Sequence, residues 1–210
     1  MAVLRAEVRE LPSGAWHPPR ETARASYGFL VLYGLLQRRV DHGLGVAREL
    51  LGPGDVVRPQ ARAYSLSLLP QHARWTVLQP ARLAVLDDRL TALIGRFPGL
   101  MVELAERQHH RALCLAHMLA ISHLPRLEDR LLATLWYLAE RWGRVTAAGV
   151  TVPLVLTHEA LGELVGAQRP SVTLALRSLR DEARLTRGED GAYVLLGDAP
   201  GRADTRAVAS

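Results

Sequence analysis

Residues 156–196 read LTHEALGELVGAQRPSVTLALRSLRDEARLTRGEDGAYVLL, and this stretch decides the fold of the C-terminal part of the chain. A first helix is expected after Thr157, whose side-chain oxygen can cap free backbone N–H groups. Gly162 has no side chain, so a second helix can cross close above it. Gly166 suits a tight turn, because glycine adopts a positive φ at little cost. The second helix is expected to begin at Gln168-Arg169-Pro170, since proline is tolerated in a first helical turn.

Apolar residues recur at helical spacing and predict the buried faces of both helices. They are Leu161, Leu164 and Val165 on the first helix, and Val172, Leu176 and Leu179 on the second. A hairpin is expected next, with strands at 185–187 and 192–196 around a turn that contains Asp190-Gly191, a strong hairpin signal. This order is typical of a winged helix-turn-helix, a module that docks on DNA.

The outer face of the second helix carries the candidate binding chemistry. Between Gln168 and Arg180 the chain has three arginines and no acidic residue. In a helix-turn-helix the first residues of this helix face base edges in the major groove, where Arg can pair with guanine and Gln with adenine. We therefore expect base readout by Gln168, Arg169, Ser171 and Thr173, and phosphate contacts by Thr157, His158 and Arg177.

Two observations limit this interpretation. A basic face on a single helix is more often only a solvated face, and it is the preceding helix, the turn and the hairpin that favour DNA. The wing is expected to be structural, because Glu189 and Asp190 at its tip would repel a phosphate that Arg187 could reach.

The charge balance gives little support for nucleic-acid binding. The chain has 26 basic residues, all of them arginine, and 21 acidic ones, a formal net charge of +5. Residues 157–197 hold five arginines against six acidic residues, which is 5 − 6 = −1. The alternative function is therefore a ligand-sensing or protein-interaction module that has kept the fold and lost specific DNA recognition.

Upstream, apolar residues spaced by threes and fours predict one long helix from Leu90 to His123. The helix is expected to close at Leu124-Pro125, because a residue before proline is pushed out of the helical region. A one-sided helix ahead of a helix-turn-helix suits a two-fold dimer in which the partner's helix covers the apolar stripe. The alternative is a helix that packs on its own domain. The expected dimer-interface residues are Phe97, Met101, Leu104, Ala112, Leu115 and Leu119.

The remaining elements are predicted from shorter patterns. A helix is expected at 128–142 and a strand at 150–156, and Pro153 makes that strand an edge strand. In the first ninety residues we expect two strands around Gly34 within 29–40, a strand, turn and strand within 49–57, and strands at 75–78 and 81–86. Short strands with Gly and Pro turns predict a small β-roll or sandwich, so the fold class is α+β.

Several classes of protein are disfavoured by what the sequence lacks. The single cysteine, Cys114, allows no internal disulfide. We find no signal peptide and no membrane-spanning run, so a cytoplasmic protein without a membrane partner is expected. The sequence has no motif of an enzyme. The spacings of His109, His110 and His117 do not fit a helical metal pair, so we expect no metal site.

The segment LGELVGAQRPSVTLALRSL, residues 161–179, resembles the DNA-binding domain of the Crp–Fnr family of bacterial transcription regulators. By position, Arg169 matches the family's base-reading arginine, and Ser171 matches its Thr or Ser. The chain departs from the family at Pro170, where many members have Glu, and at Leu174, where the cyclic-AMP receptor has a second base-reading Arg. The resemblance implies a homodimeric regulator of double-stranded DNA that acts on a pseudo-palindromic operator, with RNA polymerase as a candidate partner.

The N-terminal part resembles the effector domain of the same family, in which a turn like Gly54-Asp55 precedes the phosphate-binding cassette. The family's Gly-Glu and Arg-[ST]-Ala patterns for cyclic nucleotides are absent from 56–74, although Arg58, Arg62 or Arg74 offers a positive charge. We therefore expect no cyclic-AMP binding and no cofactor. A single cysteine also excludes the family's iron–sulfur cluster. A haem site, which one branch of the family has, is the alternative role for the histidines.

Together these patterns predict four segments. They are a cyclic-nucleotide-binding-like β-roll at 1–89, a dimerisation helix at 90–124, a winged helix-turn-helix at 125–197 and a disordered tail at 198–210.

Overall fold

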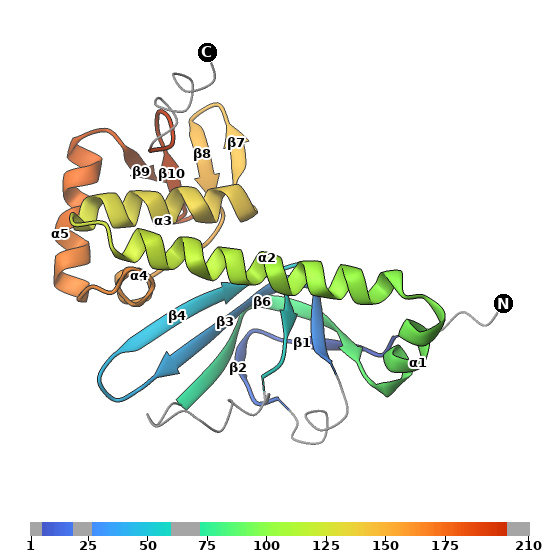
Figure 1. The fold of residues 1–210 in the computed structure, drawn as a ribbon. Coiled ribbons are helices and arrows are strands. Elements are labelled where there is room, and N and C mark those ends of the chain that lie inside the picture. The colour runs from blue at the N-terminus through green and yellow to red at the C-terminus, as the bar shows by residue number, and fades with distance from the viewer. Residues whose placement is uncertain (1–5, 19–26, 60–71, 201–210) are drawn as a thin grey trace, which may run out of the picture. The chain divides into compact units, whose positions relative to one another are not determined.

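The computed structural model describes residues 6–18, 27–59 and 72–200 (Figure 1). The chain forms two compact units, Met1–Leu115 and Ala116–Ser210, and each is described by itself below. The first unit contains an antiparallel sheet and the second a helical domain with a small sheet. The expected α+β class is therefore confirmed.

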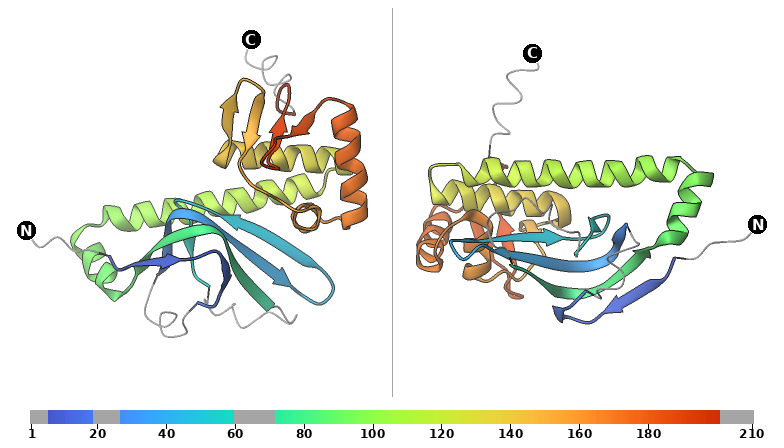
Figure 2. Two further views of the ribbon diagram at one scale, coloured as in Figure 1. Left: turned by 180° about the vertical axis from the view of Figure 1, so that it is seen from behind. Right: turned by 60° about the horizontal axis from the view of Figure 1, so that its bottom comes forward.

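Six strands form the antiparallel sheet of the N-terminal unit. Its two longest strands run side by side (Figure 2) and are flanked by the others in the order β1-β6-β3-β4, with β2 also paired to β6 and β5 to β3. The strands are β1 (Val8–Leu11), β2 (Gly14–Trp16), β3 (Gly28–Asp41), β4 (Val46–Leu51), β5 (Val56–Val57) and β6 (His72–Leu86).

The expectation of two strands around Gly34 is wrong, because β3 runs through this residue as one bent strand. Gly34 has a φ of +89°, and the register against β6 shifts between Val31 and Leu36. A Cβ atom at Gly34 would lie 2.3 Å from the carbonyl oxygen of Pro80, so only glycine fits. A glycine inside a strand marks a bulge here rather than a strand end. The strands expected at 75–78 and 81–86 are likewise one strand, β6.

Apolar side chains from β3, β4, β5 and β6 fill the core of this unit. Trp16 packs at its rim, with its ring edge-on to Phe29 at 5.6 Å and to Trp75 at 5.7 Å between ring centroids. The buried core residues are Phe29, Val31, Leu36, Leu51, Val57, Trp75, Val77, Ala81, Leu83 and Val85.

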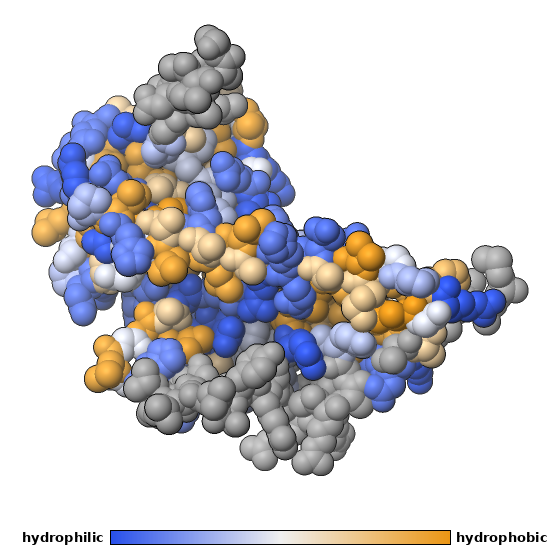
Figure 3. Space-filling model, viewed as in Figure 1, coloured by the Kyte–Doolittle hydropathy of each residue, from blue (hydrophilic) through white to orange (hydrophobic). Residues whose placement is uncertain are grey.

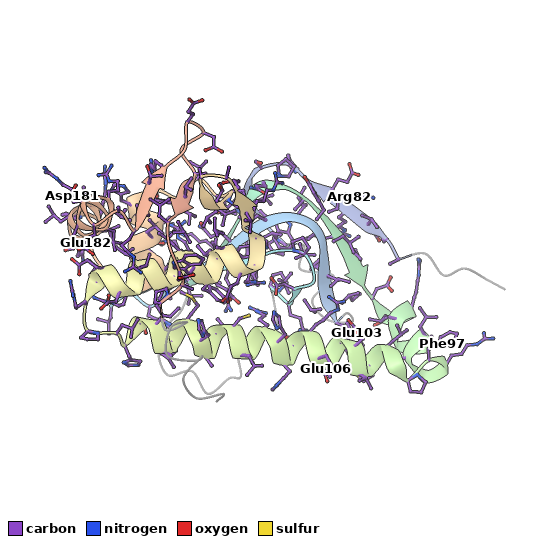
Figure 4. All side chains as sticks on the ribbon, turned by 90° about the horizontal axis from the view of Figure 1, so that it is seen from above. Arg82, Phe97, Glu103, Glu106, Asp181 and Glu182 are labelled. Carbon is purple, nitrogen blue, oxygen red and sulfur yellow. The ribbon has the colours of Figure 1, made fainter. Side chains whose placement is uncertain are left out.

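Two helices follow the sheet where the sequence predicted one. Helix α1 spans Asp88–Arg96 and is capped by the Asp87 carboxylate, which accepts from the Arg89 N–H at 3.1 Å. Helix α2 spans Gly99–Ser122. Phe97 lies at the junction (Figure 4) with a φ of −132°, outside the helical region. The single helix from Leu90 is therefore wrong, and the reason is Pro98, which disfavours a helical conformation at the residue before it.

The N-terminal half of α2 contacts the sheet through polar side chains. The Arg111 guanidinium donates to both carboxylate oxygens of Glu49, at 2.7 and 2.9 Å, and to the Val56 carbonyl at 3.3 Å. Arg107 donates to the Gly54 carbonyl at 3.2 Å, in the turn between β4 and β5. Burial alone would lower the pKa of Arg111, and its hydrogen bonds and charge pairing with Glu49, helped by Asp55, more than reverse this and raise it.

Large apolar side chains are exposed along α2. Figure 3 shows apolar surface over this helix. Met101, Leu115 and Leu119 share one face of α2 and form its exposed apolar band, whereas Val102 and Leu113 are exposed on a neighbouring face. Helix α2 therefore contacts the sheet of the N-terminal unit through polar side chains and leaves apolar side chains exposed.

The C-terminal unit combines three helices with a second antiparallel sheet of order β7-β8-β10-β9. The elements outside the helix-turn-helix are α3 (Leu127–Trp142), β7 (Arg144–Thr146), β8 (Gly149–Val152), β9 (Leu185–Arg187) and β10 (Tyr193–Leu195).

The expectation that 150–156 forms an edge strand is wrong. Strand β8 ends at Val152 and lies inside the sheet, between β7 and β10. Pro153 follows the strand, so its missing N–H removes no hydrogen bond from the ladder. The edge of the sheet next to β8 is formed by β7, a strand that is not among those predicted from the sequence.

Candidate nucleic-acid interface

The first helix of the helix-turn-helix, α4, spans His158–Val165 and ends as the sequence predicts. The Thr157 hydroxyl oxygen accepts from the Ala160 N–H at 3.1 Å and caps the helix. Gly166 closes it in the left-handed conformation with a φ of +68°. The Arg130 guanidinium from α3 donates to the last carbonyl of the helix, at Val165, at 3.1 Å. Both ends of α4 are therefore satisfied by hydrogen bonds.

Gly162 permits a close approach, although its partner is the turn rather than the second helix. A Cβ atom at Gly162 would lie 2.4 Å from the Ala167 carbonyl oxygen, but 3.6 Å from a methyl carbon of Val172 on α5. The Ala167 N–H also donates to the Gly162 carbonyl at 2.9 Å. The glycine thus fixes the path of the turn and, through it, the start of the next helix.

The second helix, α5, spans Arg169–Asp181 and separates its residues by face. Val172, Ala175, Leu176 and Leu179 are buried, so the predicted inner face is confirmed. Gln168 is the N-cap residue, and within the described residues its side chain makes no capping hydrogen bond. The exposed residues are Arg169, Pro170, Ser171, Thr173, Leu174, Arg177 and Arg180. All four expected base-reading residues therefore lie exposed at the beginning of α5.

One pair of predicted site residues is brought together directly. His158 Nδ1 lies 2.8 Å from the Thr173 hydroxyl oxygen, which links the start of α4 to α5. The same hydroxyl donates to the Arg169 carbonyl at 3.0 Å. The only proton of the Thr173 hydroxyl is thus used inside the protein. The sequence predicts base readout for Thr173 and does not predict this link between the two helices.

Positive charge surrounds His158. Burial is the largest cause that lowers the pKa of His158 from its ordinary value, followed by the charges of Arg187, Arg169 and Arg180. Two of these arginines lie on α5 and one on β9. Arg169 opens α5 and Arg180 lies in its last turn, so positive charge acts on His158 from both ends of this helix and from β9, and this suits an anionic ligand.

The wing arginine is held by the protein itself. Arg187 donates to the Tyr193 hydroxyl at 3.0 Å and to the Leu156 carbonyl at 3.4 Å, and its guanidinium carbon lies 4.7 Å from the centre of the Tyr193 ring. These contacts support the structural role expected for the wing.

The far end of α5 is acidic. Asp181 and Glu182 lie there together (Figure 4), and Asp181 pairs with Arg177 at 4.0 Å while both side chains are exposed. An exposed pair at this distance is weak, so Arg177 can exchange the carboxylate for a phosphate at little cost. The last turns of α5 therefore mix acidic and basic side chains, whereas its first turn holds Arg169 and no acidic residue.

The expected dimer-interface residues lie along α2, with one exception. Met101, Ala112, Leu115 and Leu119 are exposed on the helix, and Leu104 is half-buried. Phe97, also exposed, precedes the helix and sits at the α1–α2 junction. Their role in dimerisation stays a prediction.

The residues considered for an effector or a metal are only partly described. Arg58 and Arg74 lie within the described chain, whereas Arg62 and residues 201–210 of the expected tail lie outside it. Among the described residues, no cluster of three or more His, Cys, Asp or Glu side chains is arranged to hold a metal ion. No helix in the described part of the chain is long and apolar enough to cross a membrane.

Comparison with known proteins identifies the C-terminal domain. Residues 129–198 match the Crp-like helix-turn-helix domain. No curated protein sequence matches the chain.

Solved structures match nearly the whole chain at low sequence identity. A CooA mutant from Carboxydothermus hydrogenoformans is 16% identical with a TM-score of 0.70, covering 98% of this chain and 88% of that one. A CRP-family transcriptional regulator from Thermus thermophilus is 18% identical with a TM-score of 0.68, covering 96% and 97%. FixK2 from Bradyrhizobium japonicum is 15% identical with a TM-score of 0.70, covering 92% and 94%. The chain therefore has the fold of CRP/FNR transcription regulators, a family of regulators and not of enzymes.

Proposed function

We propose that this chain, whose C-terminal domain is a Crp-like helix-turn-helix domain, is a sequence-specific DNA-binding regulator that acts as a homodimer. The observation that carries the proposal is the exposed start of α5, where Gln168, Arg169 and Ser171 face solvent in a first turn without an acidic residue. Arg169 would read a base in the major groove, and Ser171 would contact a neighbouring base or phosphate.

The phosphate contacts would come from residues around this start. His158 lies among the arginines, and Arg177 has only a weak exposed pair with Asp181. Thr157 already uses its hydroxyl oxygen to accept from Ala160, but its hydroxyl proton remains available for a phosphate oxygen. Such contacts fix the register of the protein on DNA and set its salt dependence.

Dimerisation would use the exposed apolar band of α2. Leu115 and Leu119 are exposed, so their burial by a second copy would stabilise the dimer. Two copies related by a two-fold axis would place two α5 helices in successive major grooves of a pseudo-palindromic operator.

The regulator would work in the cytoplasm without cyclic AMP or another cofactor, and RNA polymerase is its candidate partner. The support for cyclic-AMP independence is the absence of the family's Gly-Glu and Arg-[ST]-Ala patterns from the sequence of 56–74.

The experiment is selection of bound sequences from a random DNA library by the purified, ligand-free protein. We expect enrichment of a two-fold symmetric motif with half-sites about one helical turn apart. Arg169→Ala serves as the matched variant and should lose one base preference. An ensemble with no enriched motif, for a protein shown to be folded, would contradict specific DNA binding in the absence of an effector.

A second candidate is a module that has kept the fold and lost specific DNA recognition. It is favoured by the net charge of −1 over 157–197 and by an apolar Leu174 on the exposed face of α5. Retention on heparin separates the two candidates. A DNA-binding protein elutes late and its retention falls with salt, whereas the second candidate elutes with the flow-through.

A further inference from the structure

We propose that His158 makes DNA binding depend on the uptake of one proton: it positions α5 through Thr173, and it contacts a phosphate only as the imidazolium cation. The inference rests on the proposed DNA-binding function and adds to it a specific protonation step. It is carried by the hydrogen bonds that join His158, Thr173 and Arg169.

We take the Thr173 hydroxyl as the donor to the Arg169 carbonyl, and this assignment places the proton of the neutral His158 ring on Nδ1. The Arg169 carbonyl can only accept, so the Thr173 hydroxyl is the donor in the 3.0 Å bond between them. That hydroxyl has no second proton to give to His158. The 2.8 Å contact between His158 Nδ1 and the Thr173 oxygen is therefore made by a proton on Nδ1.

The position of the proton decides whether Nε2 accepts or donates a hydrogen bond. In the neutral ring with a proton on Nδ1, Nε2 is an acceptor, and it repels a phosphate oxygen, which also accepts. A second proton turns Nε2 into a charged donor that can bind phosphate, while Nδ1 keeps its hydrogen bond to Thr173. The phosphate-binding form of His158 is thus the cation, and the form that only positions α5 is neutral.

The surroundings of His158 disfavour its protonated form in the unbound protein. In the described chain, the charged groups that act on His158 are Arg169 and Arg180 from α5 and Arg187 from β9, which Tyr193 on β10 holds in place. Together with burial, which is the larger cause, they lower the pKa of His158.

A bound phosphate would reverse this balance. Its negative charge offsets the arginines and stabilises the imidazolium, so the pKa of His158 rises when DNA binds. The proton is taken from solvent, and no other bond forms or breaks. By linkage, affinity for DNA rises as the pH falls between the bound and the unbound pKa of His158, and it levels off below the unbound one.

Thr173 has two candidate roles, a contact with a base and the link to His158. Since its only hydroxyl proton is committed to the Arg169 carbonyl, Thr173 can accept from a base or contact it through its methyl group, but it cannot donate. Its main task becomes the link to His158.

The test measures the DNA affinity of the full-length protein against pH at constant ionic strength, from about pH 6 to 8, around the ordinary pKa of histidine. We expect the wild-type affinity to rise by a factor between about three and ten for each unit of pH decrease and for each bound half-site, ten being the limit for one proton, and so by up to about 100 for the dimer. His158→Asn places an amide donor near the position of Nδ1 and cannot titrate, so this slope should be lost. His42→Asn, an exposed histidine in the N-terminal unit, is the matched control and should keep the slope.

A second measurement does not depend on a variant that folds. The calorimetric binding enthalpy of the wild type is compared in two buffers of low and high ionisation enthalpy at neutral pH. A difference that corresponds to uptake of up to one proton per bound half-site supports the proposal.

Equal binding enthalpies in the two buffers, or the same pH slope in wild type and His158→Asn, would overturn the role of His158 while leaving DNA binding intact. A folded wild type that binds no DNA at any pH would instead overturn the proposed function and this inference with it.

Discussion

Helices α2 and α5 divide their polar and apolar side chains in opposite ways. Helix α5 buries Val172 and Leu176 and exposes its arginines, as a surface helix ordinarily does. Helix α2 contacts its sheet through Arg107 and Arg111, and it leaves apolar residues such as Leu119, 61% exposed, on the surface.

The difference indicates what each helix binds. An exposed basic face is well solvated in the free protein, so α5 is suited to reversible binding of an anionic partner. An exposed apolar band is stabilised when another apolar surface covers it, so α2 is suited to a lasting protein contact. Four experiments test this comparison, beginning with the largest expected effect.

The exposed band of α2 gives the largest expected effect. Leu115→Glu combined with Leu119→Glu places charges where the second copy should pack. We expect a monomer in sedimentation velocity and a loss of DNA affinity of about 100-fold or more, since the advantage of linked half-sites disappears. Glu106→Gln, an exposed change on the same helix (Figure 4), is the control. A double variant that sediments like the wild type would show that α2 is not the dimer contact.

The polar side of α2 gives the next effect. Arg111→Met leaves the Glu49 carboxylate, only 15% exposed, without its two-fold hydrogen bond from the guanidinium. We expect a loss of about 2 kcal/mol in the free energy of unfolding by urea. Adding Glu49→Gln should restore part of it, because the second change removes a carboxylate that keeps only Arg38, at 3.7 Å, as its charged partner. Equal stability of wild type and Arg111→Met would mean that the pair contributes nothing to holding α2.

The exposed side of α5 is tested at Arg169. Arg169→Ala should cost roughly 1–3 kcal/mol on the selected site and relax one base position. Arg177→Ala should instead weaken binding to all sequences about equally and lower the salt slope by about one. The measurement is fluorescence anisotropy on specific and random DNA. Equal losses on both DNAs for Arg169→Ala would reassign Arg169 to phosphate.

The smallest effect is expected at the cap of α4, the helix that precedes α5 and packs against it. Thr157→Ala removes the oxygen that accepts from Ala160 and should lower the free energy of unfolding by about 1 kcal/mol. Thr157→Ser keeps that oxygen and should be close to the wild type in a thermal melt. If Ala and Ser are equivalent, the cap contributes nothing to the stability of the domain.

The helix-turn-helix was predictable because its signals are local. The Thr157 cap, the Gly166 turn and the Asp190-Gly191 hairpin each lie within a few residues of the structure they specify, and all three elements are confirmed. The break between α1 and α2 also has a local signal. Phe97 precedes Pro98 as Leu124 precedes Pro125, and in both places the residue before proline is disfavoured in a helix.

Other features could not be predicted from a single sequence because they join distant residues. His158 and Thr173 are 15 positions apart, and Arg111 and Glu49 are 62 apart. No periodicity or turn pattern connects such pairs, and their contact depends on how whole elements pack. The bulge at Gly34 is similar, since its cause is the Pro80 backbone on another strand.

The pairing of β3 with β6 has a consequence for how the protein folds. Gly28 pairs with Leu86 and Asp41 with His72, so the longest ladder of the N-terminal sheet joins segments that are far apart in the chain. Such non-local contacts close slowly, because the entropy of a large loop is lost before the ladder forms. During synthesis β3 emerges well before its partner, and its apolar residues must wait until β6 has left the ribosome. In the C-terminal domain β8 also pairs with a distant strand, β10, but that ladder joins only Val150, Thr151 and Val152 to their partners. We therefore expect the longer β3–β6 ladder to set the folding rate of the chain.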